Sequence, residues 1–270
     1  MRALITGASS GIGYEMAKIL DAKGIDVVIT GRRRERLEAL AKELNNHTEI
    51  ITADISDREE CIRIFREAGD VDIVINNAGV GVHGAFHETT LEDELTVLDT
   101  NITALHILTK LAYMHFRKKG SGYLMNVASS ASFCPGPYFA SYYASKAYVL
   151  RLTQALWKEA REEDMGIHIS VFCPGPVNTA FNDRAGVKAP LTGISAVRAA
   201  DCAVKGMFQG KRIVTPGIGT AICCGISKRL PDRLALSIVA KIQQAKRGYI
   251  SPHHPGQLLQ QTRRKKRQLQ

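Results

Sequence analysis

The chain has 270 residues, of which 45% are hydrophobic and 23% are charged. This balance is that of a globular protein and excludes a generally disordered chain. The formal net charge is +10, but five basic residues form one run at 263–267. Much of the basicity therefore belongs to a tail over 251–270, which is expected to be flexible. Nucleic acid is not expected as a partner, and a tail that binds nucleic acid or anionic lipid is the less favoured alternative.

The predicted elements alternate between strands and helices along the chain. Strands are expected at 2–6, 26–30, 49–53, 72–76, 123–127, 167–173 and 212–215, and helices at 13–23, 33–44, 57–67, 95–117, 141–162 and 196–208. The strands are short continuous apolar runs, whereas the helices repeat apolar residues every three or four positions. This alternation predicts an α/β fold, a doubly wound parallel sheet of about seven strands with helices on both faces. Residues 1–250 are expected to form this single domain.

Two later segments depart from the alternation. Residues of about 175–195 are rich in Pro, Gly, Asn and Asp, which predicts a substrate loop. The segment of about 216–245 carries many Ile and Leu residues and is interpreted as a lid or an oligomer contact, with a membrane-surface helix as the alternative.

Neither a cleavable signal peptide nor an apolar run long enough for a membrane span is found, so a cytoplasmic protein is expected. The six cysteines include no CxxC pair, which predicts reduced thiols and no metal site. The vicinal pair Cys223-Cys224 leaves a redox role open.

A glycine-rich turn lies between the first expected strand and the first expected helix. Its glycines allow a tight turn and a close approach of the backbone to a pyrophosphate. The start of the helix adds free N–H groups and the positive end of the helix dipole. The sequence therefore predicts a dinucleotide-phosphate site, formed by Gly7, Ser9, Ser10, Gly11, Ile12 and Gly13.

The end of the second strand predicts which dinucleotide binds. Enzymes that use NAD usually carry an acidic residue there, which bonds the ribose 2′-hydroxyl. This chain instead has Gly31 followed by Arg32, Arg33 and Arg34. Guanidinium groups pair with phosphate through a planar fork of donors, so NADP(H) is expected. Arg32 is the first candidate for the 2′-phosphate, with Ser9, Ser10 or Arg33 assisting.

A candidate proton-transfer site follows the fifth strand. Tyr142 and Lys146 are four residues apart and share one face of the expected helix at 141–162. A lysine one turn from a tyrosine is expected to lower the phenol pKa from about 10, which lets the tyrosine exchange a proton with a hydroxyl group. Ser129 ends a strand that points at the same crevice.

These motifs together resemble the short-chain dehydrogenase/reductase family over about residues 1–250. The marks of the resemblance are Thr6-Gly7-x-x-x-Gly11-x-Gly13, Asp54, Asn76-Asn77-Ala78-Gly79, Asn101, Ser129, Tyr142-x-x-x-Lys146 and Pro174-Gly175. The resemblance implies a Rossmann fold and an NADP-preferring oxidoreductase that acts on CH–OH groups. It would interconvert a carbonyl and a secondary alcohol on a small substrate, largely apolar or a hydroxy or oxo acid. A non-catalytic NADP(H)-binding regulatory protein on the same fold is the alternative.

The resemblance also implies roles for individual residues. Tyr142 would be the acid in reduction and the base in oxidation, Lys146 would lower its pKa and bond the nicotinamide ribose, and Ser129 would polarise the substrate oxygen. Asn101 would support a water in the proton relay, although an asparagine there could only cap or kink its helix. Further cofactor contacts would come from Asp54, Ile55, Asn77, Ala78, Gly79, Pro174, Gly175, Val177 and Thr179.

The substrate and the oligomeric state are less constrained. The variable segments 81–90, 132–138 and 181–191 are mostly apolar, as ligand pockets usually are. Arg184 and Lys188 are candidates for contact with a substrate carboxylate. The two long helices resemble those through which the family forms homodimers and homotetramers. The sequence leaves the substrate and the physiological direction open.

Overall fold

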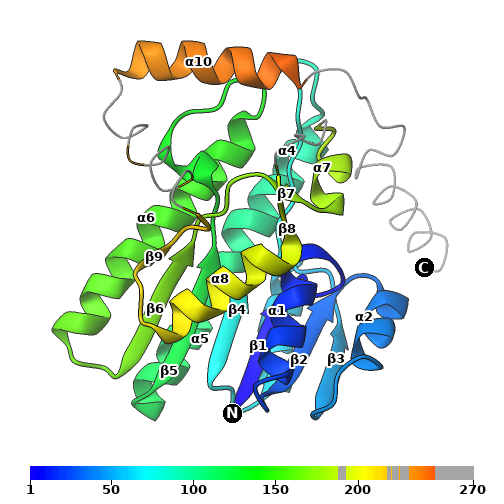
Figure 1. Cartoon of the computed structure of the whole chain (residues 1–270), viewed down its shortest axis with the longest axis vertical. Coiled ribbons are helices and arrows are strands. Elements are labelled where there is room, and N and C mark those ends of the chain that lie inside the picture. The colour runs from blue at the N-terminus through cyan, green and yellow to red at the C-terminus, as the bar shows by residue number, and fades with distance from the viewer. Residues whose placement is uncertain (188–192, 218–219, 221–224, 226–230, 247–270) are drawn as a thin grey trace.

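The fold is described from a computed structural model, which covers residues 1–187, 193–217, 220, 225 and 231–246 (Figure 1). Lys188, the Cys223-Cys224 pair and the tail over 251–270 lie outside the described residues, as do parts of the expected substrate loop and of the segment 216–245.

Seven parallel strands form one sheet, in the order β3-β2-β1-β4-β5-β6-β9. They are β1 (Arg2–Thr6), β2 (Asp26–Gly31), β3 (Thr48–Thr52), β4 (Ile73–Asn76), β5 (Gly122–Val127), β6 (Ile167–Phe172) and β9 (Ile213–Val214). In the centre of the sheet Ile5 aligns with Ile29 on one side and with Ile75 on the other. The predicted doubly wound parallel sheet is therefore confirmed, with β9 shorter than the expected strand.

Helices cover both faces of the sheet, as predicted. They are α1 (Gly11–Asp21), α2 (Arg34–Ala41), α3 (Arg58–Ala68), α5 (Leu105–Lys119), α6 (Ala140–Glu162) and α8 (Ala196–Phe208). The core on one face joins α1, α2 and α8 to the sheet, and the core on the other joins α3, α5 and α6. Figure 1 shows α1 and α8 side by side on the first face. Successive strand residues alternate between the cores, with Ile5 in the first and Leu4 in the second.

The expected helix over 95–117 is longer and has three parts. It runs through α4 (Leu91–Leu98), a π-helical turn η1 (Asp99–Ala104) and α5. Thr90 caps its start by accepting a hydrogen bond from the Asp93 N–H at 3.1 Å. A π turn inserts an extra residue without disturbing the apolar periodicity on either side, so the sequence pattern does not reveal it.

The predicted loops contain short elements that the sequence pattern did not indicate. A 3₁₀ turn, η2 (Ser130–Phe133), follows β5. Within 175–195, β7 (Val177–Asn178) pairs in parallel with β8 (Ile194–Ser195), and α7 (Ala180–Arg184) follows β7. In the segment 216–245, α10 (Asp232–Ala245) begins after Pro231 and lies across the end of the molecule at which the strands terminate (Figure 1).

A buried polar network joins β4, α5, β5 and α6. Asn76 donates hydrogen bonds from Nδ2 to Thr109 Oγ1 at 3.1 Å and to Asn126 Oδ1 at 2.9 Å. Asn126 in turn donates from Nδ2 to Thr153 Oγ1 at 3.0 Å. All of these residues are at most 2% exposed. The network thus connects the strands that precede the site to the helices that carry it.

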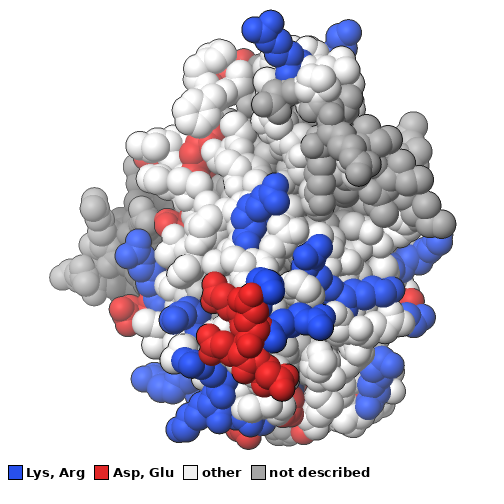
Figure 2. Space-filling model, turned by 90° about the vertical axis from the view of Figure 1, so that its left-hand side faces the viewer, with Lys and Arg blue, Asp and Glu red and all other residues white. Residues whose placement is uncertain are grey.

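On the face shown in Figure 2, Lys and Arg side chains are spread widely and a group of acidic side chains lies among them. This face presents mixed charge rather than a single basic patch. Among the helices in the described part of the chain, none combines the length and apolar character needed to cross a membrane.

Candidate active site

The side chain of Asn77 holds the glycine-rich turn after β1 through hydrogen bonds to its backbone. Gly7 and Gly11 have positive φ angles of 69° and 65°, which only glycine adopts readily. Asn77 donates hydrogen bonds from Nδ2 to Thr6 O at 3.0 Å and Gly7 O at 3.2 Å. A Cβ on Gly13 would lie only 2.3 Å from the same nitrogen. The glycine spacing therefore reflects the close approach of Asn77 as well as the turn.

The start of α1 is suited to an anion. Its N-cap residue, Ser10, makes no side-chain capping hydrogen bond, so no side-chain cap occupies the N–H groups of the first turn. These donors and the positive end of the helix dipole favour a phosphate group. The residues present thus fit the pyrophosphate of a dinucleotide.

The arginines after β2 adopt different positions. Arg33 is half-buried and donates from Nη2 to Ser9 Oγ and to Ser10 Oγ, both at 3.1 Å. Arg32 is exposed, and its Nη1 lies 3.9 Å from Asp54 Oδ2. The extended backbone of Arg33, which is the N-cap residue of α2, lets its side chain contact the two serines. The structure thus places Arg33, rather than the first candidate Arg32, at the glycine-rich turn.

Asp54 lies after β3, where the adenine was expected. Its Oδ1 accepts hydrogen bonds from the Ser56 N–H at 3.1 Å and the Ser56 hydroxyl at 2.9 Å. Ile55 beside it is half-buried and packs against the core formed by α3 and α5. Hydrogen bonds to Ser56 thus fix the Asp54 carboxylate, and packing against the core fixes Ile55.

Ser129, Tyr142 and Lys146 meet at the carboxyl end of β5. The side chains of Ser129 and Tyr142 form a hydrogen bond. Lys146 Nζ lies 5.8 Å from the centre of the Tyr142 ring and donates to Val127 O at 3.0 Å. Ser132, which the sequence analysis did not single out, donates from Oγ to Lys146 O at 2.7 Å and fixes the helix against η2.

Burial shifts the pKa values of both titratable groups. It raises the pKa of Tyr142 to about 12, against the opposing effect of the Ser129 hydrogen bond. Burial also lowers the pKa of Lys146 from 10.5 to about 8. The pKa of the phenol is therefore shifted upward in this structure, not downward as expected, because desolvation is the largest cause of the shift. A phenol with this pKa is protonated at neutral pH and can donate a proton.

Asn101 lies in the π turn and is fully buried. Its Oδ1 accepts from the Val80 N–H at 2.9 Å, and its Nδ2 donates to Val80 O at 2.9 Å and to Ser145 Oγ at 3.0 Å. A Cβ on Gly79 would lie 3.3 Å from Asn101 Oδ1 and 3.2 Å from Lys146 Nζ. Asn101 therefore lies in the π-helical part of its helix and close to the lysine.

The segment after β6 connects the glycine-rich turn to the substrate loop. Pro174 O accepts from the Ser130 N–H at 2.7 Å, and Val177 is buried in β7. Thr179 caps α7 and packs on the glycine-rich turn, where a Cβ on Gly11 would lie 3.1 Å from its Cγ2. Thr220 packs closely against Gly175, because a Cβ added to Gly175 would lie 3.2 Å from Thr220 Oγ1.

Apolar side chains from the start of α6 and from the variable segment 181–191 cover Tyr142. The Phe139 ring stacks on the Tyr142 ring with their centres 4.5 Å apart, and the Phe181 ring lies at 5.4 Å. Ala185 and Val187 complete this cluster. Only part of the predicted apolar lining, from the segment 181–191, thus lies around the phenol, whereas Phe86 of the segment 81–90 is exposed.

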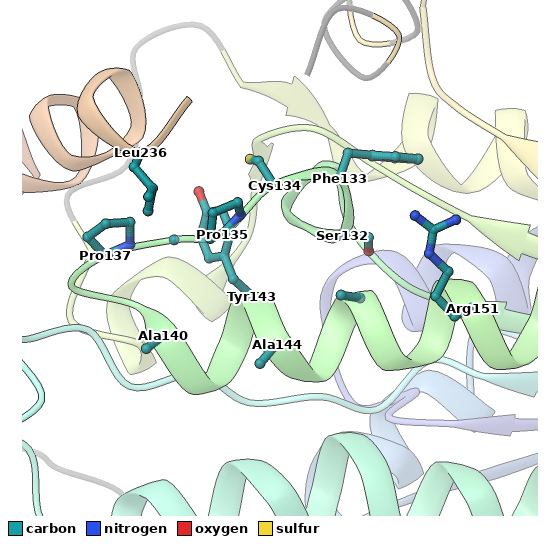
Figure 3. A pocket seen from close by; sticks show the side chains of 12 residues that line it. Ser132, Phe133, Cys134, Pro135, Pro137, Ala140, Tyr143, Ala144, Arg151 and Leu236 are labelled. Atoms are coloured by element: carbon teal, nitrogen blue, oxygen red, sulfur yellow. The ribbon is translucent and has the colours of Figure 1, made fainter. Parts of the chain in front are cut away.

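A cavity of about 480 Å³ adjoins this cluster (Figure 3). Its lining comes from η2 and the following loop, one face of α6 and one residue of α10, namely Ser132, Phe133, Cys134, Pro135, Gly136, Pro137, Ala140, Tyr143, Ala144, Ala147, Arg151 and Leu236. Neither Ser129, Tyr142 nor Lys146 is among them, so the cavity neighbours the proton-transfer site without containing it. The sequence analysis missed Gln243, which is buried and donates from Nε2 to Tyr143 Oη at 2.7 Å, fixing α10 beside this cavity.

Comparisons with known proteins agree with this geometry. The family model for short chain dehydrogenases matches residues 1–189. An uncharacterized oxidoreductase of Staphylococcus epidermidis is 33% identical over 186 residues, which cover 67% of this chain and 80% of that protein.

Two similar solved structures contain nicotinamide cofactors. A short-chain dehydrogenase from Sphingobium yanoikuyae in complex with NADPH superposes with a TM-score of 0.76 and 31% identity, over 82% of this chain and 89% of that one. A 3-ketoacyl-(acyl-carrier-protein) reductase from Brucella melitensis complexed with NADH gives a TM-score of 0.69 and 27% identity, over 80% and 97% of the two chains.

Proposed function

The chain belongs to the short-chain dehydrogenase family of oxidoreductases, and from this premise we propose that it interconverts a carbonyl and a secondary alcohol with NADP(H), using Tyr142 as the acid and base. The observation that carries the proposal is the meeting of Ser129, Tyr142 and Lys146 under an apolar cover. Acid–base catalysis needs a proton donor within hydrogen-bond reach of the substrate oxygen, and the hydroxyl groups of Ser129 and Tyr142 are two such donors.

The residues around the glycine-rich turn would hold the cofactor. The start of α1 would bind the pyrophosphate, and Asp54 and Ile55 would lie against the adenine. Arg33 supports NADP(H) over NAD(H), because its guanidinium lies beside Ser9 and Ser10 and no carboxylate ends β2. When bound, the nicotinamide supplies the hydride in reduction and accepts it in oxidation.

The protein's own groups perform the proton transfer. In reduction, Ser129 donates a hydrogen bond to the carbonyl oxygen and Tyr142 gives its proton to that oxygen. The raised pKa keeps the phenol protonated until this step. The Lys146 ammonium then stabilises the phenolate, and Asn101 supports a water that returns the proton. Phe139 and Phe181 exclude bulk water from the reacting atoms.

The test is consumption of NADPH with a panel of ketones, aldehydes, 3-oxo acids and 3-oxoacyl thioesters, with NADH in parallel. We expect turnover with NADPH preferred, and best with substrates that have an apolar body. Tyr142→Phe is expected to reduce kcat/KM by roughly 10²–10⁴-fold, the usual contribution of general acid catalysis. Tyr143→Phe is the matched control, since its hydroxyl bonds Gln243 of α10 instead.

Two outcomes would contradict the proposal. Retention of most activity in Tyr142→Phe would remove the proton-transfer role from that residue. Tight NADPH binding without turnover of any compound would favour the non-catalytic, regulatory interpretation.

A further inference from the structure

Four arginines gather beside the glycine-rich turn. Arg32, Arg33 and Arg36 come from the segment where β2 passes into α2, and Arg184 is the last residue of α7 in the substrate loop. The α7 helix is brought there by Thr179, which packs on Gly11 at the turn itself. Figure 1 shows α7 on the same side of the molecule as α1 and α2, next to the end of the sheet where the strands terminate. Two segments about 150 residues apart in sequence thus contribute to one basic cluster.

The charges in this cluster act on one another. Arg184 is exposed on the surface, yet partial desolvation by its neighbours lowers the pKa of its guanidinium, and the positive charges of Arg33, Arg32 and Arg36 lower it further, with Asp183 opposing. Burial likewise lowers the pKa of Arg33, as do Arg36 and Arg32. The sequence suggested a substrate carboxylate as the partner of Arg184, but the structure places its guanidinium within the field of the arginines at the cofactor end.

Little acidic charge balances the cluster. Arg32 has Asp54 at 3.9 Å, and within the described ranges no carboxylate lies within 4.0 Å of the guanidinium groups of Arg33, Arg36 or Arg184. Like charges held together without acidic partners repel, and a doubly charged phosphate relieves that repulsion while accepting several hydrogen bonds. A group of this kind is the 2′-phosphate that distinguishes NADP(H) from NAD(H).

We propose that Arg184 reaches from the substrate loop to the 2′-phosphate of NADP(H), so that this phosphate holds α7 against the glycine-rich turn. The inference rests on the proposed NADP(H) preference and adds a residue outside the arginines that follow β2. Because α7 also carries Phe181 against Tyr142, binding of the phosphorylated cofactor fixes one wall of the substrate site. NADH would leave that wall without this contact.

The experiment compares Arg184→Met with Arg34→Met in the complete chain. Arg34 is the matched control, since it is exposed, pairs with Glu38 at 2.7 Å and loses the same charge. Calorimetric titration with NADPH, NADH and 2′,5′-ADP measures affinity without turnover. We expect Arg184→Met to weaken NADPH and 2′,5′-ADP roughly tenfold or more, as loss of hydrogen bonds to a charged group does. NADH affinity should stay unchanged, and Arg34→Met should bind all three as the wild type does.

Hydrogen–deuterium exchange of α7 is the second readout. NADPH should protect the amides of Ala180–Arg184 more than NADH does, and Arg184→Met should remove the difference. Unchanged NADPH affinity in Arg184→Met, or equal weakening of NADPH and NADH, would overturn the inference.

Arg33→Met separates failure of this inference from failure of the proposed function. Weaker NADPH binding in Arg33→Met alone would leave the 2′-phosphate site in place and exclude Arg184 from it. Equal affinity of the wild type for NADPH and NADH would overturn both proposals.

Discussion

Lys146 is an ammonium group held where only 3% of the residue is exposed. Its lowered pKa, from 10.5 to about 8, corresponds to a cost of about 3 kcal/mol for keeping it charged in the fold. The folded pKa lies below the unfolded one, so the unfolded chain binds more protons between these values. The contribution of Lys146 to the free energy of unfolding therefore rises with pH across this window and is most unfavourable below pH 8.

Lys146→Met should consequently stabilise the fold while abolishing catalysis. At neutral pH we expect the free energy of unfolding to increase by up to about 3 kcal/mol, and the rise between the two pKa values to disappear. Urea unfolding at neutral pH and within that window measures both effects. Lys158→Met, at an exposed residue paired with Glu162, is the control. An equal loss of stability in Lys146→Met at every pH would contradict the assigned cost.

Single-residue predictions from the sequence were successful where spacing alone determines position. Tyr142 and Lys146 share a helix face by their separation, and the glycine pattern locates the turn. The sequence could not rank Arg33 above Arg32, because the backbone at the start of α2 decides which side chain contacts the serines. Nor could it give the pKa of Tyr142, which depends on burial by Phe139 at the start of the same helix and by Phe181 from the distant α7.

Among the elements, the π turn η1 links the helix α4–α5 to the site. Its Asn101 binds both the N–H and the C=O of Val80, and so sets the path of the chain just after β4. Apolar periodicity predicted the helix but not this turn, because one inserted residue leaves the pattern before and after it intact. The pairing of β7 with β8 was equally hidden, since two-residue strands depend on contacts between distant segments rather than on local sequence.

Asn101→Ala tests the role of this turn. The change leaves the half-buried N–H and C=O of Val80 without the Asn101 side chain, so we expect the free energy of unfolding to fall by about 1–3 kcal/mol. Activity should fall as well, because Gly79 and Lys146 adjoin the same side chain. Denaturant unfolding and steady-state kinetics measure the two effects. Unchanged stability would mean that Val80 finds other hydrogen-bond partners, and would contradict the role given to the Asn101 side chain in holding Val80.

On the scale of the whole molecule, the parallel sheet brings every candidate site residue to its carboxyl edge. The sequence predicted this arrangement, because alternating strands and helices admit few other topologies. It did not predict where α10 lies, since Gln243 meets Tyr143 across 100 positions of sequence. The homodimer or homotetramer stays a prediction, which sedimentation analysis would test. The exposed Leu91, Leu95 and Leu98 on one stripe of α4 offer an apolar surface for such contacts.

Deletion of residues 251–270 should leave the catalytic domain active. All candidate site residues precede this segment, and its removal lowers the formal net charge from +10 by the five basic residues of 263–267. We expect unchanged kcat/KM and NADPH affinity but weaker retention on a cation exchanger. Loss of turnover in the truncated chain would show that the segment contributes to the site.

The polar network from Asn76 to Thr153 determines which packings of the core are permitted. A purely apolar interface can slide by a fraction of a turn at modest cost, because its contacts have no direction. Amide groups are directional, and each one left without a partner in the core costs about 1–3 kcal/mol. A slip of α5 or α6 along the sheet would break several of these bonds at once. The network therefore fixes the positions of α5 and α6 along the sheet. Side chains that never contact the substrate thus set the separation of Asn101 from Lys146.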